Sequence, residues 1–119
     1  MQKQRQAKTT LHKTSHGCVI SDAGCNVIQL EFGNLFLRFD AKGLVSFKQC
    51  IDQLDLERYE IANESKPYHR KVFVALQPTG VTMAFTREEV LELRELLQAA
   101  AAILMLKKLS YDALNYPKN

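Results

Sequence analysis

The 119-residue chain has no catalytic or cofactor-binding sequence motif, so no residue type or spacing assigns it a reaction or a cofactor. It also has no apolar run near the roughly 20 residues that a membrane-spanning helix requires, and we expect no membrane span. Its first thirteen residues are basic and polar, without the apolar stretch of a secretory signal peptide. With three cysteines, an odd number, we expect reduced thiols and a cytoplasmic protein.

Composition places the chain among ordinary globular proteins, with 46% hydrophobic and 24% charged residues. The net charge of +3 is local: Lys3, Arg5, Lys8 and Lys13 give the first thirteen residues +4, and the remaining 12 basic and 13 acidic residues give −1. We interpret residues 1–14 as a mobile basic arm, residues 15–109 as a single domain and residues 110–119 as a C-terminal tail.

Four stretches alternate between apolar and polar residues, which predicts half-buried β-strands. Their ranges are 26–32, 35–39, 72–76 and 81–85. Gly33 and Asn34 separate the first two stretches and predict a two-residue hairpin turn, because both residue types tolerate positive φ. Residues 78–80, Pro-Thr-Gly, predict the turn of the second hairpin.

Two helices are predicted, each beginning at a capping residue. Asp40 is a good N-cap for a helix over residues 41–54, and Thr86 with Glu89 forms a capping box for a helix that runs to about residue 109. The inward-facing set of the first helix is Leu44, Phe47, Cys50, Ile51 and Leu54. The outer face of the second is predicted to be solvated and carries Arg87, Glu88, Glu92, Arg94 and Glu95. The polar stretch 57–70 is predicted to be a loop.

The order strand–strand–helix therefore occurs twice, and a shift of 46 positions superposes the two patterns. This indicates either an internal repeat over residues 26–56 and 71–109 or merely a shared periodicity. Both interpretations predict an α+β fold: a two-layer sandwich of ββα-ββα order, with a four-stranded, mainly antiparallel sheet and two helices on one face.

The stretch 25–37, Cys-Asn-Val-Ile-Gln-Leu-Glu-Phe-Gly-Asn-Leu-Phe-Leu, resembles the start of a small family of uncharacterised bacterial proteins, a domain of unknown function. Members of this family combine a Cys-containing lead-in and a Leu-x-Phe-Gly-Asn hairpin with a later Phe-Thr/Ser-x-x-Glu-Leu helix start. The later motif corresponds here to residues 85–90, with Val90 in place of leucine. The resemblance covers roughly residues 16–106 and implies no activity and no functional residue.

One segment contains four side chains of the types that bind zinc: His12, His16, Cys18 and Cys25. It lacks the tight Cys-x2–4-Cys spacing of a structural zinc site, so two surface histidines and two buried thiols are the favoured interpretation. A disulfide between Cys18 and Cys25, or a Cys nucleophile activated by His16, is a weaker alternative. Cys50 is interpreted as a core residue.

Phe36 and Phe73, with Arg38 and Lys71, are predicted on the second face of the sheet. Aromatic and basic side chains on an open sheet are typical of single-strand nucleic-acid platforms. Nucleic-acid binding through this face and the basic arm is therefore an alternative function, but Glu31 on the same face and the near-neutral body disfavour it.

The favoured function is protein–protein contact as a homodimer, because residues 99–106 are apolar on every side of their predicted helix. The predicted interface consists of Leu96, Ala99, Ala102, Ile103, Leu106, Phe36 and Phe73. Burying about 600 Å² of apolar surface per chain would contribute on the order of 15 kcal/mol before the entropy of association is subtracted. The intramolecular rival is residues 111–116 folding back over the helix. An enzymatic role ranks below both binding functions.

Overall fold

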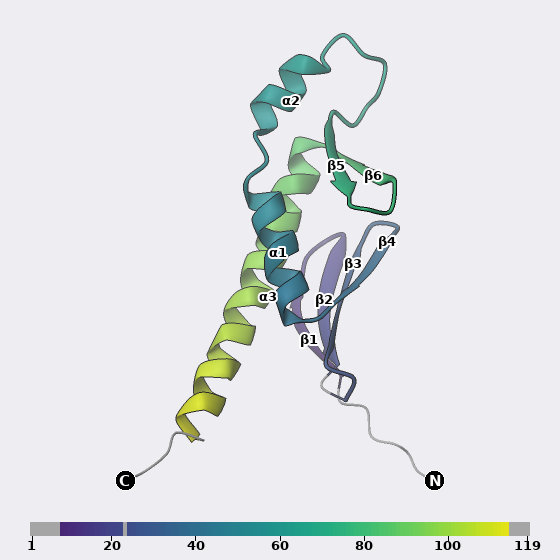
Figure 1. Cartoon of the computed structure of the whole chain (residues 1–119). Helices are drawn as coiled ribbons and strands as arrows, with labels where there is room; N and C mark the ends of the chain where they lie inside the picture. The colour runs from purple at the N-terminus through teal and green to yellow at the C-terminus, as the bar shows by residue number, and fades with distance from the viewer. Residues whose placement is uncertain (1–7, 23, 115–119) are drawn as a thin grey trace.

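The structure, a computed structural model, describes residues 8–22 and 24–114, with side chains up to residue 108. Along the chain the elements are β1 (Lys8–Lys13), β2 (Gly17–Asp22), β3 (Val27–Phe32), β4 (Leu35–Phe39), α1 (Ala41–Asp52), α2 (Leu56–Ala62), β5 (Val72–Leu76), β6 (Val81–Phe85) and α3 (Arg87–Leu114). Figure 1 shows a sheet and a small hairpin on one side of the long helix α3.

The larger sheet is an antiparallel meander in which β1, β2, β3 and β4 lie in sequence order. α3 contacts β1 and β2, α1 contacts β3 and β4, and the two helices contact each other. Both helices therefore lie on one face of this sheet. The prediction of an α+β fold with a four-stranded antiparallel sheet and two helices on one face is confirmed.

The membership of the sheet differs from the prediction. β5 and β6 pair only with each other and form a separate two-stranded sheet. Their places in the four-stranded sheet are taken by β1 and β2, so the element order is ββββααββα in place of ββα-ββα. Strand–strand–helix does occur twice, but the two hairpins lie in different sheets.

The predicted mobile arm over residues 1–14 is wrong for residues 8–13, because these pair with β2 and bury Leu11 in the core. Residues 1–7 lie outside the described part of the chain. The predicted C-terminal tail is likewise wrong for residues 110–114, which continue α3. The remainder of that tail, residues 115–119, is also outside the description.

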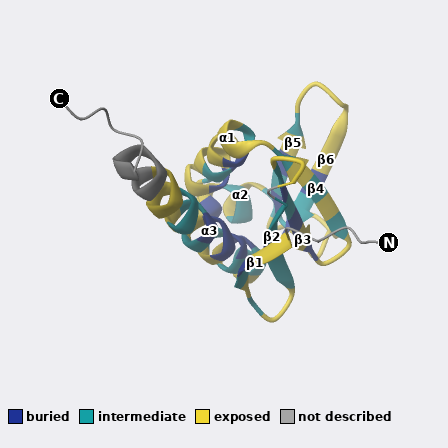
Figure 2. Cartoon of the chain, turned by 90° about the horizontal axis from the view of Figure 1, so that it is seen from below, coloured by how far each residue is buried: buried dark blue, intermediate teal, exposed yellow. Residues whose placement is uncertain are grey.

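The core lies between the inner face of the four-stranded sheet and the two helices. Val19, Leu30, Leu44, Leu93 and Leu97 are completely buried there. Figure 2 shows that the buried residues of α3 lie on the side that faces the sheet. The hairpin joins this core where the ring of Phe85 on β6 meets that of Phe32 on β3 edge-on, with 6.2 Å between the ring centres.

The predicted helix starts and the first hairpin turn are confirmed. The Asp40 carboxylate accepts from the Gly43 N–H at 2.7 Å at the start of α1. In the capping box of α3, the Glu89 N–H donates to Thr86 Oγ1 at 3.1 Å and the Thr86 N–H donates to Glu89 Oε1 at 2.8 Å. Gly33 has a φ of +59° in the turn between β3 and β4, a conformation that costs glycine little.

The loop predicted over residues 57–70 contains a helix, α2, so the prediction is wrong for residues 57–62. Asp55 caps this helix by accepting from the Arg58 N–H at 3.2 Å. Leu56 is buried in its first turn, and the side chain of Asn63 just after it donates to the backbone oxygens of Tyr59 and Lys71. Cys50, predicted in the core, is exposed on α1, while Leu54 is packed against the core.

α3 gives the molecule an elongated shape. Its 28 residues span about 42 Å, and Figure 1 shows the C-terminal half running out beyond α1 and the sheets. The radius of gyration is 17.2 Å, whereas a compact domain of this length has about 13.5 Å. The first half of α3 is thus part of the body, and the second half projects from it.

Candidate functional site

The first half of α3 holds the loop between β1 and β2 through Glu92. This carboxylate accepts hydrogen bonds from Thr14 Oγ1 at 2.6 Å and from the His16 N–H at 2.7 Å, and it lies 2.8 Å from His16 Nδ1. Partial burial alone would raise the pKa of Glu92, but the bonds from Thr14 and His16 outweigh it and hold the pKa below its ordinary value. One residue of α3 thereby fixes a loop more than 70 positions earlier in the chain.

Two arginine–glutamate pairs hold α2 and the segment before β5 against the start of α3. The Arg87 guanidinium donates to Glu60 on α2, with 2.7 Å from Nη2 to Oε1, and this bond lowers the pKa of Glu60. Arg70 donates from Nε and Nη2 to the two oxygens of Glu89 at 2.9 and 2.8 Å. The bonds from Arg70 are the largest cause of the lowered pKa of Glu89.

Arg94 holds the C-terminal end of α1. Its Nε donates to the carbonyl oxygen of Ile51 at 3.1 Å, and its Nη2 donates to that of Leu54 at 2.9 Å. Carbonyls at a helix C-terminus have no partner within the helix, and a cation there also interacts favourably with the helix dipole.

The prediction that the polar face of α3 is simply solvated is therefore wrong for Arg87, Glu92 and Arg94, each of which binds a different element or loop. Glu95 is exposed, as predicted, and its Oε2 lies 3.1 Å from His12 Nε2 on β1. Spacing along the helix could not reveal these contacts, because every partner is distant in the sequence. These contacts hold the body together, and the exposed apolar residues on the outer side of α3 remain as the candidate for contact with other molecules.

The outer stripe of α3 is the set of outward-facing residues that continues from the body onto the projecting half. It consists of Leu91, Gln98, Ala99, Ala102, Met105 and Leu106. Leu91 is 49% exposed, Met105 65% and Leu106 64%. Between Leu91 and Ala102 the surface is slightly hollowed, and the charged or polar side chains of His12, Arg94 and Glu95 also line this hollow. The stripe thus combines a shallow central hollow with two large, exposed apolar side chains.

The predicted interface residues lie in three different places: on the outer stripe, in or against the core, and on the sheets. Ala99, Ala102 and Leu106 belong to the outer stripe, and Ile103 is packed against the core. Leu96 is completely buried inside the chain, so its assignment to an interface is wrong: it packs where α3 crosses the start of β2. Phe36 is half exposed on β4.

Phe36 and Phe73 do not share one sheet face, because they lie on β4 and β5 in separate sheets. Tyr68 packs edge-on against Phe73, with 5.5 Å between the ring centres. The single aromatic platform that suggested nucleic-acid binding is therefore not formed. Phe36 keeps Arg38 beside it, with the guanidinium carbon 5.6 Å from the ring centre.

The four candidate zinc ligands are not gathered into one site. His12 and His16 are paired with Glu95 and Glu92, Cys18 lies on β2, and Cys25 is exposed in the turn before β3. Within residues 8–22 and 24–114 no group of three His, Cys, Asp or Glu side chains could hold a metal ion. All three cysteines are free thiols, so the predicted alternative of a Cys18–Cys25 disulfide is not formed.

The described helices, α3 included, are all too short or too polar to cross a membrane. A family model with the description "Family of unknown function (DUF6686)" matches residues 3–119. No curated protein and no solved structure matches the sequence.

Proposed function

Since the chain belongs to the family of unknown function DUF6686, we propose its role from its own surface: it acts by protein–protein contact, as a homodimer formed through the outer stripe of α3. In this proposal two copies of α3 pair along their projecting halves. The dimer is a cytoplasmic one, in which the three free thiols remain reduced.

The observation that carries the proposal is the exposure of Met105 and Leu106 beside small residues. Two neighbouring apolar side chains, each about two-thirds exposed, project on a helix that has left the body of the protein. Ala102 lies about one turn and Ala99 about two turns before them, and both present only methyl groups, so a second helix can approach closely. Burial of the two large side chains between such helices is favourable by roughly 25 cal/mol per Å² of apolar surface.

Charge favours a second copy, in antiparallel orientation, as the occupant. Glu88, Glu92 and Glu95 make the first half of α3 acidic, whereas Lys107 and Lys108 follow the apolar segment. Antiparallel pairing brings the acidic half of each helix toward the basic end of the other, and it opposes the two helix dipoles. A parallel pair would bring like charges together.

The stripe is also self-complementary, as a two-fold interface requires. With Ala102 on the two-fold axis, Gln98 lies opposite the partner's Leu106 and Ala99 lies opposite the partner's Met105. The small side chains of Ala99 and Ala102 then leave room for the partner's Met105, which lets the two helices interdigitate there.

Light scattering at micromolar concentration tests the proposal. We expect a mass near 27 kDa, twice the 13.6 kDa of one chain, and a mass near 13.6 kDa for the double variant Met105→Lys, Leu106→Lys. The matched control is Val45→Lys, Ile61→Lys, which places two lysines at exposed apolar positions on α1 and α2 and should remain dimeric.

A wild-type protein that stays monomeric at 100 µM would refute the homodimer. A dimer that is unaffected by the Met105 and Leu106 substitutions would refute the outer stripe as its interface. Far-UV circular dichroism of each variant verifies that the helices are retained.

A further inference from the structure

The free edge of β6 is a strand edge without the usual protection. Exposed edges of natural sheets carry lysines, prolines or bulges, which prevent another strand from pairing with them. β6 reads Val-Thr-Met-Ala-Phe and contains no charge and no proline, and its pairing with β5 has a continuous register.

The other sheet edges of the described structure differ in this respect. β1 has Lys8 and Lys13 at its ends and a bulge between Thr10 and His12. β4 carries Arg38. The β5 side of the hairpin lies against α2, whose neighbour Asn63 donates to the Lys71 carbonyl just before the strand. β6 alone combines an apolar sequence with an open side.

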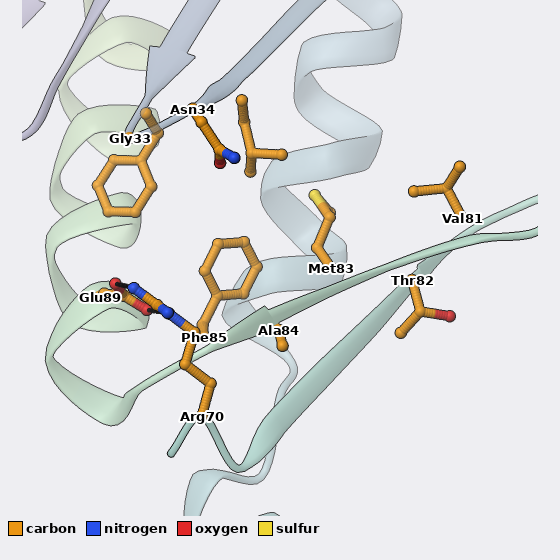
Figure 3. Close-up of a pocket in the computed structure, with 11 residues that line it drawn as sticks. Gly33, Asn34, Arg70, Val81, Thr82, Met83, Ala84, Phe85 and Glu89 are labelled. Carbon is orange, nitrogen blue, oxygen red and sulfur yellow. Dashed lines mark hydrogen bonds and ion pairs between the residues drawn. The ribbon is translucent and has the colours of Figure 1, made fainter. Parts of the chain in front are cut away.

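A groove of about 540 Å³ runs along this edge (Figure 3). All five residues of β6 line it, although successive side chains of a strand point to opposite faces. The groove must therefore follow the edge of the strand, where backbone N–H and C=O groups that do not face β5 are directed. Its opposite wall is the end of the β3–β4 hairpin, residues 32–35.

The groove is apolar and electrically balanced. Phe32, Met83 and Phe85 contribute buried apolar surface to it. At one end Arg70 donates from Nε and Nη2 to the two carboxylate oxygens of Glu89, as Figure 3 shows, so the pair offers no uncompensated charge to a ligand. An uncharged segment suits such a groove.

Neither terminus of this chain is a suitable occupant of the groove. From Glu89 to Leu114 the helix is about 37 Å long, and the five residues beyond it reach at most about 18 Å. Residues 1–7 precede Lys8, which pairs with Asp22 at the end of the sheet remote from Gly33 and hence from the groove. They also contain two positive charges, Lys3 and Arg5, for which the groove would need an acidic partner. The only described acid lining the groove, Glu89, is already bonded to Arg70.

A second copy of the hairpin is also a poor fit. A single added strand lies about 4.8 Å from β6. If β6 of a second copy paired here, β5 of that copy would follow it, and the groove would need about twice that width. The β3–β4 turn already closes the opposite side of the groove.

We propose that β6 binds an extended, uncharged peptide segment of another protein as a third strand of the β5–β6 sheet. Backbone hydrogen bonds to residues 81–85 supply the affinity, and alternate apolar side chains of the peptide pack on Phe32 and Met83. The site is separate from the outer stripe of α3 and does not depend on the dimer.

The probe is a fluorescein-labelled, end-blocked peptide of seven alternating valines and threonines. We expect its fluorescence anisotropy to saturate on titration with the protein, and hydrogen exchange at the amides of residues 81–85 to slow in the complex. Thr82→Lys puts a charge on the exposed edge and should weaken binding about tenfold or more. Val45→Lys on α1 is the matched control and should bind as the wild type does.

A peptide with proline at its central position cannot complete the strand and should not bind. The Met105→Lys, Leu106→Lys variant should bind like the wild type, which separates this site from the dimer interface. The proposal is overturned if the alternating peptide does not saturate up to about 1 mM, or if Thr82→Lys or the proline peptide leaves binding unchanged. It is equally overturned if the amides of residues 81–85 become protected by raising the protein concentration alone, since a second copy would then occupy the edge.

Discussion

Gly17 lies where an added side chain would have less room than at Gly33, Gly43 or Gly80. It begins β2 at the point where α3 crosses the sheet. A Cβ atom on Gly17 would lie 2.5 Å from the carbonyl oxygen of Glu31 and 2.9 Å from side-chain carbons of Leu96 and Phe32. The backbone oxygen belongs to the neighbouring strand and cannot move aside without disturbing the sheet, so the glycine permits the close approach of three elements.

Gly17→Ala should therefore destabilise the protein by about 2–3 kcal/mol through overpacking, as measured by urea unfolding. Gly43→Ala is the matched control: it lies in the first turn of α1, its new Cβ would meet the Asp40 carboxylate at 3.1 Å, and a helix favours alanine over glycine. We expect the control to change stability by less than about 1 kcal/mol. Equal effects of the two substitutions would contradict this account of Gly17.

Glu92 links stability to pH. Its pKa is lowered in the folded protein, so the folded state favours the ionised carboxylate more than the unfolded state does. The stabilisation is complete above the unfolded value of about 4.3 and is lost as the pH falls through the lowered folded value. Acid should thus weaken the attachment of the β1–β2 loop to α3.

Glu92→Gln tests this linkage. The amide cannot replace all the carboxylate bonds to Thr14 and His16, so the variant should be less stable by about 1–2 kcal/mol at pH 7. The difference from the wild type should shrink as the pH falls below about 4.3, because the wild type loses its ionised form as the pH passes through the lowered pKa of Glu92. Glu60 and Glu89, whose pKa values are also lowered, are present in both proteins and cancel in the comparison. A difference in unfolding free energy that stays constant with pH would argue against the role of the charge.

Among the elements, α2 shows how a short helix can be fixed by one buried residue. It has seven residues, of which Leu56 is buried, while Ile61 is 60% exposed. Tyr59 is partly buried against the core. The remaining attachments are the Glu60–Arg87 pair and Asn63, which joins the end of α2 to the backbone before β5. Because exposed ion pairs contribute little, Leu56 should dominate its docking.

Leu56→Ala should cost about 2–3 kcal/mol of stability, whereas Ile61→Ala should change it by less than about 0.5 kcal/mol. Both substitutions remove aliphatic carbon from the same helix, so helix propensity does not account for the difference. Urea unfolding measures both values. Similar losses for the two variants would mean that Leu56 is not the anchor.

The sequence predicts local elements well where they carry their own signal. β3, β4, β5, β6 and the starts of α1 and α3 follow from alternation and capping residues, and the structure confirms them. β1 is not predicted from the sequence, because only Leu11 of its six residues is buried and the segment therefore has no apolar–polar alternation. α2 was hidden because a charged, seven-residue helix is too short to establish a periodicity.

Pairing between elements is where sequence reasoning failed. Alternation identifies a strand but does not name its neighbour, so four predicted strands were joined into one sheet although β5 and β6 stand apart. The contacts of the charged residues of α3 are not predictable for the same reason, since the partners of Glu92 and Arg94 lie far away in the chain. The sequence predicts the exposed apolar side chains beyond residue 98, but it does not predict that Leu96 is buried.

At the scale of the whole molecule, body and projection have separate roles. The body is held together by contacts to the first half of α3, and the groove beside β6 is part of it. The projecting half carries Met105 and Leu106 about one and a half turns beyond the last fully buried residue, Ala100. A dimer formed there leaves β6 open, so the proposed dimer could carry two peptides at once.

The dependence of the body on the first half of α3 has a consequence for the protein as it is synthesised. The β1–β4 meander is complete at Phe39, yet the part of α3 that is buried against the body ends only at Ala100, 61 residues later (100 − 39). At about 5–20 residues per second a ribosome needs roughly 3–12 s for that interval. During it the nascent chain exposes Val19 on β2 without α3 to cover it, so we expect chaperones and proteases to compete for the protein in this interval.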